Sequence, residues 1–86
     1  MKSICEINNA GTKRWYMNHH LHKEDGPAIE YSDGDKEWYL NGKRHRVDGP
    51  AIEYGDKDKF WFYHGKQIDC KDNQEFLRMI KLMAFL

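Results

Sequence analysis

A repeat of 23 residues organises most of this chain and constrains its fold more than any other feature. Residues 15–33 and 38–56 are identical at 12 of 19 aligned positions, and the segment DGPAIEY stands at both 25–31 and 48–54. Trp15, Trp38 and Trp61 keep the same step, so a third, degenerate copy begins near Lys57. Self-similarity at this period indicates stacked structural units that contact mainly their neighbours.

The residues within one unit predict two short strands and two turns. Residues 51–54 (AIEY) are β-branched and aromatic, and the polar turn 55–58 follows them. Residues 36–40 end at Asn41-Gly42, the pair favoured in a two-residue type I′ hairpin, so 43–46 should be the returning strand. The segment Asp48-Gly49-Pro50 must then leave the sheet, because proline cannot donate to a central ladder.

The hairpin turn also predicts which residues face each other across the two strands. The position opposite each tryptophan holds histidine in two copies and isoleucine in the third. A site with this choice of residues is predicted to be a partly buried packing position. The predicted pairs are Trp15 with His22, Trp38 with His45, and Trp61 with Ile68.

The last segment changes from the pattern of a strand to that of a helix. Asp72 and, three residues later, Glu75 make a start that resembles a capping box. Nine of the eleven residues from Phe76 to Leu86 are apolar. We therefore expect a helix over 72–86 that is buried on more than one side and caps the last repeat. The alternatives are that this helix is a surface for a dimer or a partner, or that it is an interfacial membrane anchor.

Length and charge narrow the class of protein. Eighty-six residues suit a single domain, 1–86, with hairpin repeats over 4–70 and the helix after them. Fourteen Lys and Arg balance fourteen Asp and Glu, which argues against nucleic-acid binding through backbone electrostatics. No run approaches the roughly 20 apolar residues of a transmembrane helix, and no secretory signal follows Met1. Cys5 and Cys70 are expected to be too far apart for a disulfide, so we expect a cytoplasmic protein.

The histidines and acidic residues do not predict a catalytic or metal site. His20 and His22 would share a strand face about 6–7 Å apart, a spacing that zinc permits without requiring it. Lys43 replaces His20 in the middle copy, however, so the pair does not belong to the repeat. Candidate acids and bases such as His45 and Asp48 recur at matched positions, with no nucleophile beside a base. We predict no enzyme activity, no metal and no cofactor.

Alternation along the strands separates two faces of the sheet, one of which we expect the helix to roof. Trp15, Trp38 and Trp61 share one face. The opposite face carries aromatic residues among charges, a composition that anchors protein interfaces but also forms ladders between strands. If this face anchors a protein interface, the residues predicted to contact a partner are Arg14, Tyr16, Glu37, Tyr39, Arg44 and Phe62.

The unit W-Y-x-N-G-K-x-H-R-x-D-G-P-A, complete in 38–51, resembles a variant of the MORN repeat. The resemblance covers about residues 11–69. The first copy departs from the repeat pattern at 19–21, and the third copy departs from it after Lys66. The resemblance implies an elongated antiparallel sheet of hairpins. Proteins with MORN repeats are mostly scaffolds and interaction modules, and association with membrane lipids has been proposed for some. This variant is similar to repeats in small proteins of large phages and giant viruses.

These observations predict a mainly β protein, an antiparallel sheet of stacked hairpin repeats with one C-terminal α-helix, that binds another protein without catalysis. If a phage encodes the chain, its small size, the lack of a catalytic constellation and the exposed aromatic and charged face favour a small inhibitor or adaptor that acts on a host or defence protein. The first alternative is a structural homo-oligomer, formed through the edge strand or the C-terminal helix. The second alternative is binding to nucleic acid or to a membrane surface.

Overall fold

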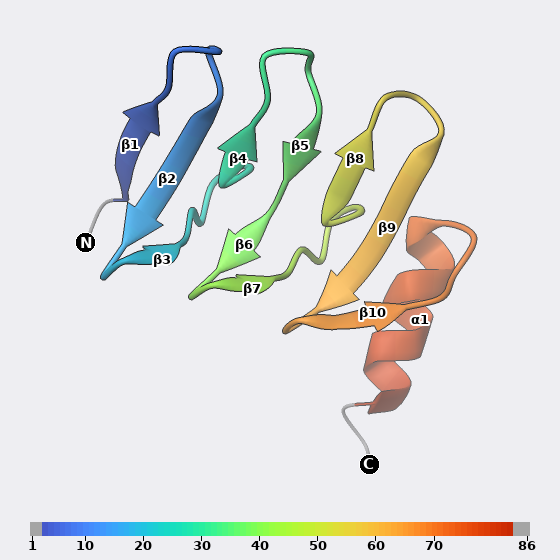
Figure 1. The fold of residues 1–86 in the computed structure, drawn as a ribbon. Helices are drawn as coiled ribbons and strands as arrows, with labels where there is room; N and C mark the ends of the chain where they lie inside the picture. The colour runs from blue at the N-terminus through green and yellow to red at the C-terminus, as the bar shows by residue number, and fades with distance from the viewer. Residues whose placement is uncertain (1–2, 84–86) are drawn as a thin grey trace.

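A computed structural model describes residues 3–83 and shows a mainly β protein with one C-terminal helix, as predicted. Antiparallel hairpins stand side by side along the longest dimension, and the principal extents are 42 × 30 × 16 Å (Figure 1). The elements are β1 (Ile4–Ile7), β2 (Lys13–Met17), β3 (His20–Leu21), β4 (Ile29–Glu30), β5 (Lys36–Glu37), β6 (Tyr39–Leu40), β7 (Lys43–Arg44), β8 (Ile52–Tyr54), β9 (Asp58–Tyr63), β10 (Lys66–Ile68) and α1 (Asn73–Met83).

One sheet runs through all the repeats in the order β1-β2-β4-β5-β8-β9-β10, with β3 paired to β2. The hairpin β6–β7 is separate from this sheet in its strand pairing, but β5 and β6 continue each other across Trp38. The N–H of Trp38 donates to the carbonyl of Ala51, and its carbonyl accepts from the N–H of His45. The hairpins therefore form one continuous surface, with β1 as an edge strand.

The predicted type I′ turn is present in the middle copy. Asn41 and Gly42 have φ angles of 52° and 81°, the left-handed region that this turn requires at both positions. Asparagine and glycine adopt this region more readily than other residues, which explains the preference for the pair. The equivalent turns of the first and third copies, Asn18-His19 and His64-Gly65, also have positive φ at both positions.

The predicted pairing across each hairpin is confirmed. Trp61 is the register partner of Ile68 in β9–β10. Backbone hydrogen bonds of 3.0 and 3.1 Å join His22 to Trp15 and His45 to Trp38. The returning strand β7 is shorter than predicted and ends at Arg44, because the following residues already turn into the loop that leaves the sheet.

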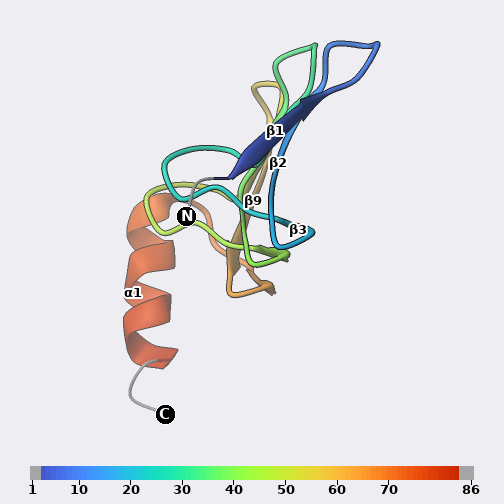
Figure 2. The ribbon, with the colours of Figure 1, turned by 90° about the vertical axis from the view of Figure 1, so that its left-hand side faces the viewer.

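The buried core is small because the sheet is a single layer. The Ala-Ile pairs of the repeat, at 28–29 and 51–52, are buried in both complete copies. Burial of one isoleucine side chain contributes roughly 1.5–3 kcal/mol, so these pairs stabilise the joints between hairpins. The hairpin tips bend away from the sheet toward the side opposite α1 (Figure 2).

The helix α1 begins with the predicted capping interaction. The N–H of Glu75 donates to Oδ1 of Asp72 at 2.8 Å, and the Glu75 carboxylate accepts from the N–H of Lys71 at 3.3 Å. These two bonds satisfy backbone donors that have no partner within the helix.

The prediction that the helix is buried on more than one side is wrong for its described residues. Phe76 is the only buried residue between 73 and 83, while Leu77 and Leu82 are exposed. The helix lies along the β9–β10 end of the sheet on the side of the Asp-Gly-Pro loops (Figures 1 and 2). A single-layer sheet offers only one surface to a helix, so the other sides of α1 face solvent. Residues 84–86 of the predicted helix lie outside the described residues.

Candidate functional site

The face predicted to contact a partner, here called the tyrosine face, contains a buried carboxylate. Glu37 is only 3% exposed. Its register partners on the two neighbouring strands, Ile29 and Ile52, are also buried. A carboxylate between two isoleucines needs internal hydrogen bonds, because an unpaired buried charge is strongly unfavourable.

Three tyrosine hydroxyls supply those hydrogen bonds. Tyr31 and Tyr54 donate to Oε2 of Glu37 at 2.7 and 2.9 Å, and Tyr39 donates to Oε1 at 2.9 Å. Burial alone would raise the pKa of Glu37, but the three hydroxyls and nearby Arg44 outweigh burial and hold this pKa below its ordinary value. The carboxylate is therefore ionised and fully engaged inside the fold.

Arg44 covers this cluster from the adjacent strand. Its Nε donates to the hydroxyl of Tyr39 at 3.2 Å and lies 3.6 Å from Oε1 of Glu37. Its guanidinium carbon lies 5.3 Å from the ring centroid of Phe62 and 5.9 Å from that of Tyr39, a cation–π arrangement. A shallow hollow of about 370 Å³ opens beside these side chains and is also lined by Lys43.

The structure brings Glu37, Tyr39, Arg44 and Phe62 together but buries two of the predicted contacts. Glu37 and Phe62 are nearly inaccessible, so neither can serve as a direct partner contact in this conformation. The cause is the side chains that cover them: three tyrosines surround Glu37, and Arg44 lies beside Glu37 and over the ring of Phe62. The predicted contacts that keep accessible surface are Arg14, Tyr16, Tyr39 and Arg44.

The opposite face, here called the tryptophan face, carries cations stacked on indole rings. Nζ of Lys23 lies 3.9 Å from the ring centroid of Trp15, and Cζ of Arg46 lies 3.8 Å from that of Trp38. Each cation stands eight residues after its tryptophan. Sequence reasoning missed this pairing, although the shared spacing of a basic residue after Trp in two copies was a signal for it.

Additional hydrogen bonds hold Arg46 in place. Its Nε donates to Oδ1 of Asp48 at 2.8 Å, and its Nη1 donates to the carbonyl of Pro50 at 3.0 Å. The hydrogen bond from Arg46 is also the main cause that lowers the pKa of Asp48. Arg46 therefore joins the loop to the tryptophan and fixes the shape of this face.

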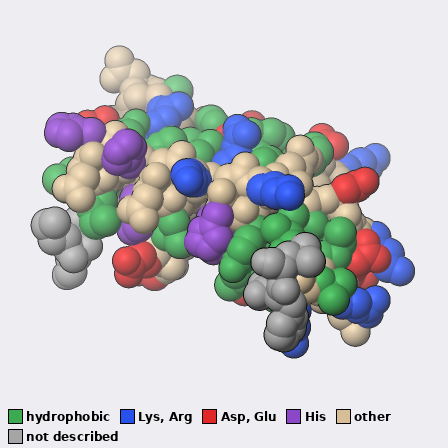
Figure 3. All heavy atoms as spheres, turned by 90° about the horizontal axis from the view of Figure 1, so that it is seen from below, with side chains coloured by type: hydrophobic (Ala, Val, Ile, Leu, Met, Phe, Trp, Pro, Cys, Tyr) green, Lys and Arg blue, Asp and Glu red, His purple; other side chains and the backbone are tan. Residues whose placement is uncertain are grey.

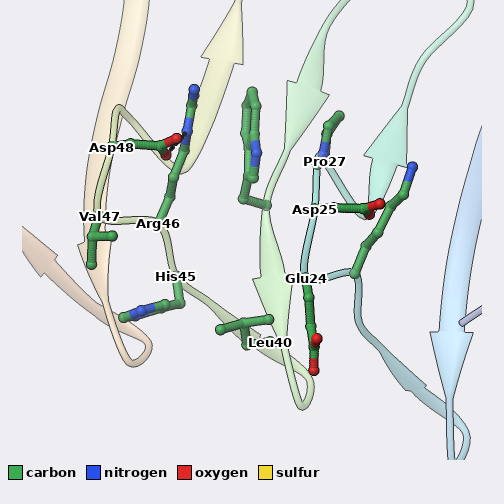
Figure 4. A pocket seen from close by; sticks show the side chains of 11 residues that line it. Glu24, Asp25, Pro27, Leu40, His45, Arg46, Val47 and Asp48 are labelled. Carbon is green, nitrogen blue, oxygen red and sulfur yellow. Dashed lines mark hydrogen bonds and ion pairs between the residues drawn. The ribbon is translucent and has the colours of Figure 1, made fainter. Parts of the chain in front are cut away.

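A groove of about 480 Å³ lies on the tryptophan face between the two Asp-Gly-Pro loops (Figure 4). We call it the Trp38 groove, and its floor is defined here as the lining residues of the hairpin between the two loops, Trp38, Leu40 and His45. Glu24 and Asp48, whose side chains are more than four-fifths exposed, stand on opposite walls. The lining residues are 23–27 from the first loop and 46–48 from the second, together with the floor.

On the underside of the molecule, histidine and hydrophobic side chains occupy different regions. Histidine side chains are spread along this surface, and hydrophobic side chains gather at the α1 end (Figure 3). The exposed residues Leu77 and Leu82 of α1 belong to the helix at this end. Within residues 3–83, no group of three or more His, Cys, Asp or Glu side chains is arranged to hold a metal ion.

Comparisons with models of protein families, with curated proteins and with solved structures find no match. The resemblance to MORN repeats therefore depends on residues 38–51 and on the 23-residue step, and it stays a prediction. Cys5 and Cys70 are both free thiols. The described part of the chain contains no helix with the length and apolarity needed to cross a bilayer.

Proposed function

We propose that this chain is a non-catalytic protein-interaction module whose main contact surface is the Trp38 groove. The observation that supports the proposal most is the composition of this groove, an indole and Leu40 on the floor with charged side chains on the rim. Val47, on the second loop, is 46% exposed and lines the groove. An apolar centre with a polar rim is the arrangement found at protein interfaces, where buried tryptophans are often energetic hot spots.

The rigidity of the groove also favours binding over catalysis. Arg46 and Asp48 hold each other, so they are not free to exchange protons with a substrate. A surface that is already ordered loses little conformational entropy on association. These features support recognition of a partner.

The finer proposal is an inhibitor or adaptor, encoded by a phage and acting in the cytoplasm on a host or defence protein. It rests on the sequence resemblance and on the small size of the chain. The geometry contributes a rigid surface, which an inhibitor and a scaffold both need.

Capture from a bacterial lysate on the immobilised protein tests the proposed function. We expect a stoichiometric protein that the wild type retains and that Val47→Lys loses, because the new side chain fills the groove with a charge. Asn9→Lys adds the same charge on an exposed turn outside the groove and should retain the protein. Equal capture by all three proteins would argue against the groove, and no capture would argue against the module.

A second candidate function, self-association, is favoured by the edge strand β1. Ile4 and Ile7 are 72% and 63% exposed on this strand, whose outer edge has no neighbouring strand in the described part of the chain. An unpaired edge with exposed apolar residues is a template for pairing with another chain. Sedimentation over a range of concentrations tests it: a mass that rises with concentration, and that Ile7→Lys returns to the monomer value, would support a homo-oligomer.

A further inference from the structure

We infer that the Trp38 groove binds an amphipathic α-helix of another protein, with one aromatic side chain of that helix beside the stacked pair of Trp38 and Arg46. This inference rests on the proposed function and names the kind of partner. The template for the complex lies in the same molecule, where the first turn of α1 meets Trp61, the counterpart of Trp38.

The docking of α1 against the last hairpin defines what such a groove accepts. The indole N–H of Trp61 donates to Oδ1 of Asn73 at 3.3 Å, which places the first turn of α1 at this tryptophan. Phe76 follows three residues later and is fully buried. Ile80 and Met83 continue the stripe at helical spacing and are partly buried. One stripe of an otherwise exposed helix therefore packs on the sheet, with an aromatic residue at its centre.

The repeat makes the Trp38 groove the counterpart of the surface under α1. The floor residues Trp38, Leu40 and His45 correspond, 23 residues on, to Trp61, Tyr63 and Ile68. The Asp-Gly-Pro loops that wall the groove lie on the same side of the sheet as α1 (Figure 2). Each repeat advances the sheet by two strands, about 9–10 Å, and the axes of packed α-helices lie about 8–10 Å apart. The spacing of the repeat thus accommodates about one helix per hairpin.

The helix that fits comes from another protein because α1 is already in use. Its buried stripe is centred on Phe76, and α1 is the one helix among residues 3–83. A second copy of the chain could offer this stripe only by giving up its own contact with Trp61.

Charge narrows the chemistry of the partner helix further. Glu24 and Asp25 line the groove and make no ion pair with Lys or Arg among the described residues, whereas Asp48 is paired with Arg46 and Lys23 is stacked on Trp15. An acidic rim favours a helix with Lys or Arg beside its apolar stripe. The solvent-facing side of α1 carries the same kind of residues, Arg78 and Lys81.

The probe for this inference is a peptide with the sequence of residues 72–83, held helical by a covalent staple between positions 74 and 78. Positions 74 and 78 are exposed in α1, so the staple leaves the packing stripe free. Without a staple, a peptide of this length would be mostly unfolded in water. The full-length protein is labelled with ¹⁵N, and the three indole N–H signals are followed by NMR during titration.

We expect the signal of Trp38 to shift and saturate. A peptide carrying Phe76→Ala should bind about tenfold more weakly or worse, because it lacks the aromatic anchor. The protein variant Val47→Lys should keep the folded spectrum and lose the Trp38 shift, while Asn9→Lys should behave like the wild type. A shift confined to Trp61 would mean that the peptide only replaces α1 and would overturn the inference. Absence of any shift would overturn it as well.

Failure of this inference can be separated from failure of the proposed function. If the peptide does not bind but a captured protein depends on Val47, the module stands and a helix is the wrong occupant. If the peptide binds at Trp38 but the lysate yields no protein, the preference for a helix stands and the proposed function fails. A dimer of the unliganded protein that Val47→Lys dissociates would assign the groove to a second copy and overturn the choice of another protein.

Discussion

The backbone N–H of Asn41 donates a hydrogen bond of 2.9 Å to Nδ1 of His22, nineteen residues earlier in the chain. The N–H of His64 makes the same bond, at 2.8 Å, to Nδ1 of His45. Each bond joins the returning strand of one hairpin to the type I′ turn of the next. The third copy has Ile68 at the position of the histidine, and among residues 3–83 the next element is α1, which has no turn that requires this acceptor.

Replacement of His22 by isoleucine, the residue of the third copy, should destabilise the protein. The N–H of Asn41 would lose its acceptor, and because this residue is exposed we expect the loss of free energy of unfolding to be about 0.5–1.5 kcal/mol, the net value of one hydrogen bond. Urea unfolding measures the loss. His64→Asn is the matched control, because asparagine occupies the same turn position in the other two copies, and we expect a change within about 0.5 kcal/mol. Equal losses in both variants would show that the histidine bond contributes nothing specific.

Glu37→Gln should also destabilise the fold, by about 1–3 kcal/mol. The amide presents donors to tyrosine hydroxyls that now donate to a carboxylate, so at least one of the bonds is lost. Glu53→Gln provides the comparison at a more accessible carboxylate, which pairs with Arg46 at 3.4 Å, and we expect it to change stability by less than 1 kcal/mol, roughly the value of a surface ion pair. If Glu37→Gln were as stable as the wild type by urea unfolding, the cluster would not hold the tyrosine face together.

Stability should fall in alkaline solution because of the tyrosines around Glu37. Burial, and then the hydrogen bond to Glu37, raise the pKa of Tyr54 to about 12 and raise the pKa of Tyr31 and Tyr39 above the ordinary value of about 10. The unfolded chain therefore loses these protons first. The stabilisation is complete below about pH 10 and disappears as the pH rises through the folded values.

Urea unfolding between about pH 9 and 11.5 checks this dependence. In Glu37→Gln the slope of stability against pH should be smaller, since the carboxylate that raises the tyrosine pKa values is gone. The same slope in both proteins would contradict the claim that Glu37 raises the pKa of the tyrosines.

Replacement by alanine should change the stability of the protein differently at the two loop glycines, Gly26 and Gly49. A Cβ on Gly49 would come within 2.6 Å of Cζ of Arg46, whereas a Cβ on Gly26 would meet Nζ of Lys23 at an ordinary 3.6 Å. Gly49→Ala should push Arg46 off Trp38 and cost about 0.5–2 kcal/mol, the range of a cation–π contact. Gly26→Ala should be neutral or slightly stabilising. Unfolding free energies measure both, and a reversed order would show that Arg46 does not stabilise the loop.

Local sequence signals predicted the repeat architecture well. The step of the tryptophans, the Asn41-Gly42 turn and the start of the helix at Asp72 depend on residues close together in the chain, where geometry follows directly from residue type. The register of each hairpin followed from the turn, since a two-residue loop leaves no freedom in the pairing.

The accessibility of the two faces could not be predicted in the same way. The burial of Glu37 depends on Tyr31 and Tyr54, which belong to different hairpins and meet only after the sheet has formed. Strand alternation placed Tyr39 and Phe62 on one face correctly but could not show which side chains cover it. The Trp38 groove was missed for the same reason, because its walls are loops one repeat apart.

The most direct test compares the two faces in one binding measurement. Isothermal titration of the captured partner would be carried out with the wild type, with Val47→Lys in the Trp38 groove, and with Tyr16→Ala on the tyrosine face. We expect Val47→Lys to weaken binding by about tenfold or more, as at an interface hot spot, and Tyr16→Ala to stay within about twofold. The reverse pattern, with Tyr16→Ala abolishing binding and Val47→Lys unchanged, would place the partner on the tyrosine face and contradict the assignment to the groove.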